Sequence, residues 1–211
     1  MDQHELIERI TDPDKWPGFE NSEQLHQMDD MAEAAFSRNT ADGYLAYVLI
    51  IHQICDDLIR MLIAHSHFTL ELLTVSNGFG IRFPNENLDK YTSGQLLQAL
   101  ERSFLDFDQR DEFIKVCNEM NSIRNQMAHQ LAKQPNLEQL KQTAEKYKTK
   151  VATVEELFSA ADDNFRLFYK DEKKSDTWDI YLQEALNDAS GGEERAEYER
   201  LIKIRKEAGY G

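Results

Sequence analysis

The feature that most constrains the fold of this 211-residue chain is a single apolar stretch, residues 44–63. It follows a turn-forming sequence, residues 39–43, and its apolar side chains would cover much of the circumference of a helix. A helix of this kind is buried, which places it at the centre of a helical bundle. The stretch is nevertheless too polar to span a membrane. Its polar residues are His52, Gln53, Asp56, Asp57 and Arg60.

Apolar periodicity and capping residues predict further helices on both sides of the central one. Residues 64–92 are harder to assign: 68–75 could extend the central helix or form a strand, and 76–80 form a turn that could close a hairpin. We favour a helix followed by a long loop. The other expected helices are 3–10, 22–37, 94–105, one opened by Asp108 or Asp111, 136–169, and 176–206 with an interruption at 190–192.

These helices predict an all-α fold with one main domain, an antiparallel helix bundle at residues 41–170. Residues 1–40 form an acidic N-terminal helical extension, and residues 171–211 form a charged C-terminal one. The apolar stripe of the C-terminal extension is too thin for a core of its own. We therefore expect it to pack against the bundle or a second subunit.

The charge of the chain limits its partners. A formal net charge of −15 argues against nucleic acid as a partner of the whole surface, although residues 110–150 are locally basic. No secretory signal is visible, so we expect a cytoplasmic protein that has no contact with a membrane. Cys55 and Cys117 lack metal-ligand spacing, and the sequence predicts no cofactor and no metal.

One short motif places polar side chains within an apolar helical run. Arg124, Asn125 and His129 stand among residues that would turn one helix face to a core. An arginine, an amide and an imidazole that titrates near neutral pH are suited to acid–base chemistry on a phosphate. We therefore take these three residues as the candidate catalytic site. The apolar residues around them are Phe113, Cys117, Met120, Ile123, Met127 and Leu131.

In this Arg-Asn-x-x-x-His pattern, and in the layout of residues 41–165, the chain resembles the HEPN superfamily of helical proteins. It is also similar to the mannitol-repressor-like branch of small acidic helical proteins, which is not tied to catalysis. The HEPN resemblance implies a HEPN-type bundle and metal-independent cleavage of RNA by a homodimer of the toxin or defence type. His129 would act as general base or acid, Arg124 would offset the charge of the phosphorane, and Asn125 would orient the imidazole or substrate.

Helix geometry complicates this assignment. Asn125 and His129 are four residues apart and share a face, whereas Arg124 and His129 diverge by about 140° on a continuous helix. Either the helix bends between Arg124 and His129, or the arginine of one subunit joins the histidine of its mate.

Other interpretations stay open. Arg124 could instead pair with Asp56 or Asp57, and His129 could cap a helix end. The chain would then be a non-catalytic regulatory or protein-binding module of the same fold, with a cognate antitoxin or regulatory protein as partner.

The helical spacing of His52 with Asp56, and of Gln53 with Asp57, could suggest a metal site. A polar seam inside the bundle is the favoured interpretation. If that seam lies near Arg124, Asp56 or Asp57 would support the arginine, and replacing either carboxylate by an amide would impair activity.

Overall fold

The computed structural model describes residues 3–19, 22–75, 87–103, 105–131 and 136–210. Every regular element in these ranges is helical, which confirms the expected all-α class. Two short 3-10 turns, Pro13–Lys15 and Leu88–Lys90, accompany the α-helices. The α-helices are α1 (Gln3–Thr11), α2 (Ser22–Ser37), α3 (Ala41–Val75), α4 (Ser93–Glu101), α5 (Arg110–Leu131), α6 (Leu137–Glu172), α7 (Asp176–Asp188) and α8 (Gly192–Glu207).

The chain forms two compact units, and each is assembled from distant stretches of sequence. The larger unit, residues 19–64 and 85–162, holds α2, α4, α5 and most of α3 and α6. The smaller unit, residues 1–18, 65–84 and 163–211, holds α1, α7, α8 and the ends of α3 and α6. The expected boundaries at residues 40 and 170 stay a prediction.

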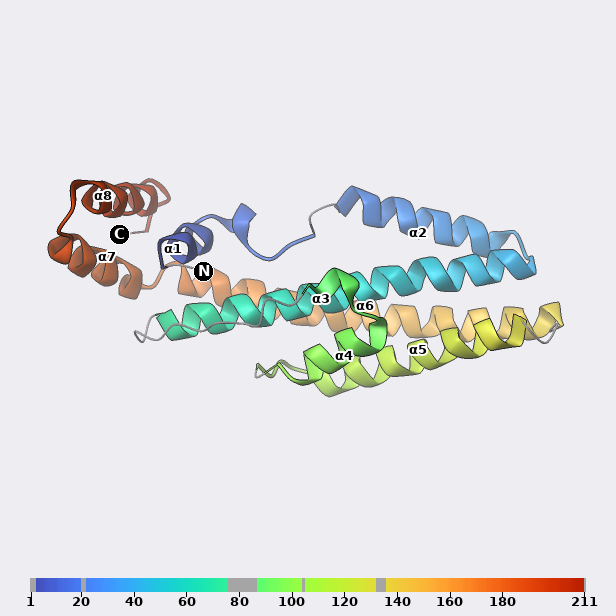
Figure 1. The fold of residues 1–211 in the computed structure, drawn as a ribbon. Coiled ribbons are helices and arrows are strands. Elements are labelled where there is room, and N and C mark those ends of the chain that lie inside the picture. The colour runs from blue at the N-terminus through green and yellow to red at the C-terminus, as the bar shows by residue number, and fades with distance from the viewer. Residues whose placement is uncertain (1–2, 20–21, 76–86, 104, 132–135, 211) are drawn as a thin grey trace. The chain divides into compact units, whose positions relative to one another are not determined.

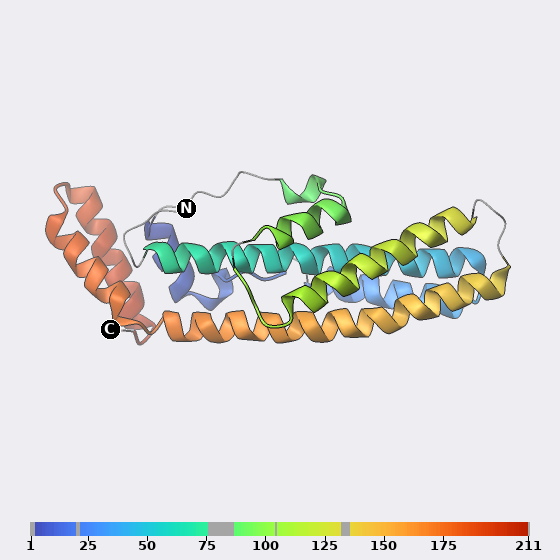
Figure 2. The same ribbon diagram turned by 90° about the horizontal axis from the view of Figure 1, so that it is seen from below.

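In the larger unit, α5 lies beside α3 and α6 and runs opposite to both (Figures 1 and 2). The core of this unit is lined by α3, as its apolar circumference predicts: Tyr47, Val48, Ile51 and Ile59 are all buried. The short helix α4 packs on α5.

The turn into α3 depends on a glycine. A Cβ at Gly43 would clash with the backbone oxygen of Ala35 on α2 and would crowd the hydroxyl of Thr40. Just before it, Asn39 takes a left-handed conformation (φ 52°), which asparagine tolerates better than most residues. Together these residues let α2 and α3 meet at a tight corner.

The boundaries of α4 and α5 differ from the expected ones. The structure ends α4 at Glu101 and not at residue 105, and it begins α5 at Arg110 and not at either aspartate. The guanidinium of Arg110 donates to the backbone oxygens of Leu100 and Glu101, at 2.7 Å each, and so satisfies the end of α4. Gln109, with φ 61°, turns the chain into α5.

Other caps agree with the sequence. Thr92 and Gln95 form a capping box at the start of α4, and Asn136 Oδ1 accepts from the Glu138 amide at the start of α6. Residues 68–75 extend α3, as favoured, and the turn expected at 76–80 lies outside the described residues.

In the smaller unit, α8 packs on both α7 and α1. Its stripe residues Tyr198 and Leu201 are buried, and Arg205 is buried with them. The stripe therefore packs within its own chain. None of the helices in the described ranges has the length and apolar character needed to cross a membrane.

Candidate functional site

The three motif residues lie on α5, which continues without interruption from Arg110 to Leu131. Arg124 is half-buried, whereas Asn125 and His129 are exposed. The Arg124 Nη2 donates to Asn125 Oδ1 at 2.9 Å, so the structure joins the arginine to the asparagine. Met127, between them and His129, is fully buried and anchors this turn of the helix in the core.

The structure does not bring Arg124 to His129. No break in α5 separates these two residues, and among the described residues His129 forms no hydrogen bond or ion pair. No interruption of α5 unites the motif, and a bend between Arg124 and His129 stays a prediction. The contribution of a second subunit stays a prediction.

A buried polar chain crosses the interior of the same unit. The His52 Nδ1 lies 2.9 Å from the hydroxyl of Tyr147 on α6, and its Nε2 lies 2.8 Å from Ser93 Oγ on α4. Ser93 in turn donates to Asp56 Oδ2 at 2.9 Å. His52, Asp56 and Ser93 are each at most 9% exposed, so water does not compete for these bonds.

When Asp56 is ionised, all the hydrogen bonds of the buried polar chain point in one direction, towards the carboxylate. A carboxylate only accepts, so Ser93 gives its proton to Asp56 and must accept one from His52 Nε2. The His52 Nδ1 is then an acceptor for the Tyr147 hydroxyl. His52 is thus a neutral imidazole with both nitrogens engaged.

Burial is the main cause of the shifted pKa values in the buried polar chain. Desolvation, aided by the nearby charge of Arg124, lowers the pKa of His52 to about 4. Burial raises the pKa of Asp56, while the Ser93 hydrogen bond and the charges of Arg60 and Arg124 oppose that rise. The phenol of Tyr147 also has a raised pKa because it is buried, and Arg124 again acts against the shift.

The charge of Arg124 thus affects the pKa values of His52, Asp56 and Tyr147. His52 and Asp56 form the expected polar seam, joined through Ser93. Gln53 is exposed and Asp57 forms an ion pair with Arg60 at 2.5 Å, so these two residues are not part of the seam. Sequence reasoning missed Ser93 and Tyr147. They lie 41 and 95 residues from His52, and neither stands in a motif that would reveal it.

The basic character of residues 110–150 is partly neutralised. Lys150 pairs with Glu119 at 2.5 Å, and Lys148 pairs with Glu33 of α2 at 2.6 Å. Lys148 also lies over the ring of Phe36, 5.0 Å from its centroid. These paired cations contribute less charge for a nucleic acid than the sequence suggests.

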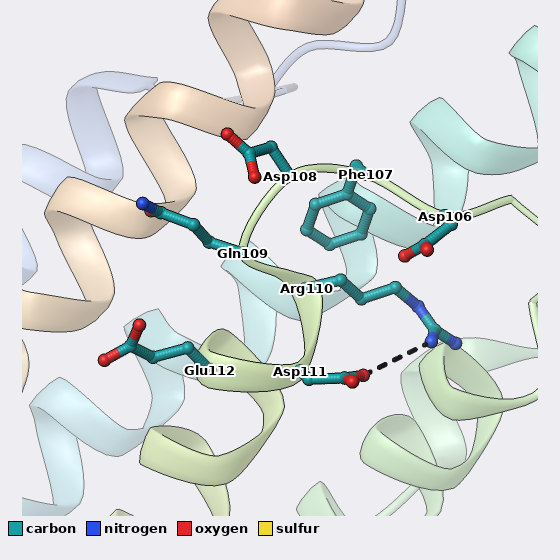
Figure 3. A pocket seen from close by; sticks show the side chains of 7 residues that line it. All are labelled: Asp106, Phe107, Asp108, Gln109, Arg110, Asp111 and Glu112. Atoms are coloured by element: carbon teal, nitrogen blue, oxygen red, sulfur yellow. Dashed lines mark ion pairs between the residues drawn. The ribbon is translucent and has the colours of Figure 1, made fainter.

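A cavity of about 470 Å³ opens at the turn between α4 and α5. Residues 106–112 line it, and Figure 3 shows the side chain of Arg110 directed away from Glu112 and towards α4, with its ion pair to Asp111 dashed. None of the motif residues lines this cavity. It therefore adds nothing to the candidate site on α5.

The metal alternative gains no support in the described ranges, where no group of three or more His, Cys, Asp or Glu residues could hold an ion. Comparisons of the chain with protein-family models, with curated proteins and with solved structures found no match.

Proposed function

We propose that this chain is a HEPN-like, metal-independent endoribonuclease that works as a homodimer. The observation that carries the proposal is the arrangement on α5. Arg124 is hydrogen-bonded to Asn125, and the imidazole of His129 is exposed on the face that Asn125 shares. An exposed imidazole can reach a substrate, and a guanidinium has five donors, of which the bond to Asn125 uses one.

The reaction follows from these side chains. The 2′-hydroxyl of RNA attacks the adjacent phosphate, His129 removes or returns a proton, and Arg124 offsets the charge of the phosphorane. The 5′-oxygen of the next nucleotide leaves with a proton, and a 2′,3′-cyclic phosphate remains. Because Arg124 and His129 diverge on one helix, the arginine of one subunit would serve the histidine of its mate.

The first test is RNA cleavage in EDTA by the wild type and by Arg124→Ala and His129→Ala. Loss of either side chain should lower the rate by roughly 100-fold or more, the usual scale of acid–base and charge contributions. Matched controls are the alanine variants of two exposed residues, His26 on α2 and Arg38 just after it. A folded, dimeric wild type that leaves RNA intact would contradict the proposal.

The second test decides how the site assembles. In a 1:1 mixture of Arg124→Ala and His129→Ala, half of the dimers are mixed, and each mixed dimer has one complete site if the two residues come from different subunits. About a quarter of wild-type activity should return on mixing. If both residues acted within one chain, the mixture would stay inactive.

A second function is favoured by the ion pairs of Lys148 and Lys150, which reduce the charge available to RNA. In that alternative the chain is a non-catalytic regulatory or protein-binding module, with an antitoxin or regulatory protein as partner. The hydrogen bond from Arg124 to Asn125 then has a structural role. Binding of a partner without RNA cleavage is the outcome that identifies this alternative.

A further inference from the structure

The exposed face of α5 carries a run of hydrogen-bonding side chains that continues from the motif towards the start of the helix. Its members are spaced alternately three and four residues apart, so they lie along one side of the helix. All of them are exposed. We call this face the amide stripe; it consists of Lys115, Asn118, Ser122, Asn125 and His129.

Carboxylates are almost absent from this part of an otherwise acidic chain. The chain has 39 acidic residues among 211, yet Glu119 is the single one in residues 113–137. Glu119 is turned about 100° away from its neighbour Asn118 on the helix, and it forms an ion pair with Lys150. Towards the start of α5, acidic residues resume at Glu112. The amide stripe is therefore a surface that an anion can approach.

The polar groups of the amide stripe are open to an external partner. Among the described residues, no hydrogen bond occupies the side chain of Asn118 or Ser122, and Lys115 has no ion pair. The Asn125 Oδ1 accepts from Arg124, which leaves the amide donors of Asn125. The stripe thus offers amide and hydroxyl groups over about four helical turns, with one lysine at the end farthest from His129.

A nucleic acid fits the amide stripe better than a second protein does. Positions at alternate spacings of three and four residues form the seam of a helix pair when they are apolar, whereas those of the stripe are polar. The core of a protein interface also favours aromatic side chains and methionine, and it is poor in lysine and serine. An RNA strand offers groups that the stripe can bind: phosphates for Lys115, and 2′-hydroxyls and base edges for the amides and the hydroxyl.

We infer that the amide stripe binds the RNA strand beside the cleaved phosphate, and that this strand is unpaired. The inference rests on the proposed function, because His129 defines which phosphate is cleaved. Base edges are accessible in a single strand, whereas a duplex is bound mainly through its phosphates and 2′-hydroxyls. Lys115 and Arg124 supply two cations, far fewer than the roughly 6 to 10 phosphate contacts of strong duplex binders. From Asn118 to His129 the stripe extends about 16 Å, the length of about five stacked nucleotides.

The first experiment measures binding and does not depend on cleavage. A fluorescent, unpaired RNA of about ten nucleotides is titrated with the full chain in EDTA, and Kd is obtained from anisotropy. His129→Ala is the background, so that the RNA stays intact. In that background Asn118→Ala and Ser122→Ala should each raise Kd by about 2- to 10-fold, the equivalent of one lost hydrogen bond. Asn187→Ala and Ser190→Ala alter exposed residues at the end of α7 and just after it; as matched controls they should leave Kd unchanged.

The salt dependence of Kd tests the kind of contact. With Lys115 and Arg124 as the two phosphate-binding cations, Kd should rise about sevenfold between about 50 and 200 mM salt, and only about threefold in Lys115→Gln. An RNA duplex of the same sequence should bind more weakly than the single strand. A duplex that binds as tightly, or an unchanged Kd in both Asn118→Ala and Ser122→Ala, would overturn the inference. So would loss of a wild-type dimer in the double variant, measured by light scattering, because the stripe would then be an interface between subunits.

Cleavage separates this inference from the proposed function. Asn118→Ala should raise the KM of RNA cleavage and leave kcat unchanged, because this side chain touches the strand but not the reacting atoms. A wild type that binds the unpaired strand but leaves it intact would refute the proposed function, while weaker binding by Asn118→Ala and Ser122→Ala would still support the amide stripe as the RNA surface. A wild type that neither binds nor cleaves RNA would overturn both.

Discussion

The buried imidazole of His52 makes the larger unit sensitive to acid. Its pKa is about 4 in the folded chain against 6.5 for an ordinary histidine, because burial disfavours the charged ring. Between about pH 4 and 6.5, this side chain therefore binds more protons in the unfolded chain than in the folded one. Stability that depends on neutral His52 is fully present above about pH 6.5 and is lost as the pH falls towards 4.

The size of the effect follows from the two pKa values. At about pH 5 the folded chain should have lost roughly 2 kcal/mol of its free energy of unfolding through this one group, and at about pH 4 roughly 3 kcal/mol. Asp56 acts in the opposite direction. Its raised pKa means that its protonation favours the folded state as the pH falls.

A comparison of variants separates the two contributions. His52→Gln keeps a neutral polar side chain at this position and retains Asp56. The free energy of unfolding is measured by urea titration with circular dichroism, for the wild type and His52→Gln, at about pH 7 and about pH 5. The advantage of the wild type should shrink by roughly 2 kcal/mol over this interval. His129→Gln, which changes an exposed ring, should follow the wild type. A wild-type advantage that stays constant with pH would refute the reasoning.

Two further predictions concern stability. Arg205 is fully buried and donates to both oxygens of Asp179, at 2.8 and 3.1 Å, so Arg205→Ala should lower the free energy of unfolding by about 3 to 5 kcal/mol. The exposed Arg200→Ala should cost at most about 1 kcal/mol in the same urea titration, and equal effects would contradict this account. Gly43→Ala should lower the melting temperature, because its Cβ would strike the backbone of α2, by an amount equivalent to about 1 to 3 kcal/mol. Gly94→Ala, whose Cβ meets nothing within 4 Å, should instead leave the melting temperature unchanged or raise it.

Most of the helical framework was accessible to sequence reasoning because it depends on local signals. The apolar circumference of residues 44–63 and the cap at Asn136 predicted α3 and the start of α6. The end of α4 was misplaced because the cap is provided by the guanidinium of Arg110, nine and ten residues further along the chain. The helix propensities of residues 101–105 carry no information about that contact.

The candidate site was predictable only in part, for the same reason. The spacing of His52 and Asp56 on one helix face indicated a polar seam. The residues that complete it, Ser93 and Tyr147, come from other helices, and their roles depend on tertiary packing. The sequence identified the motif residues on α5, but it did not predict how Arg124 and His129 could meet. A helix that continues through both residues keeps them on different faces.

His52 and His129 of the larger unit also show why close hydrogen-bond geometry alone does not indicate a catalytic group. His52 and Ser93 are 2.8 Å apart, a spacing that a serine hydrolase would use for its base and nucleophile. Both are buried, however, with exposures of 6% and 4%, and Ser93 already donates to Asp56. A hydroxyl so enclosed does not reach a substrate carbonyl, and an imidazole with both nitrogens engaged and a pKa of about 4 stays neutral near pH 7. The exposed His129 lacks such partners among the described residues, so its ring, unlike that of His52, is open to solvent.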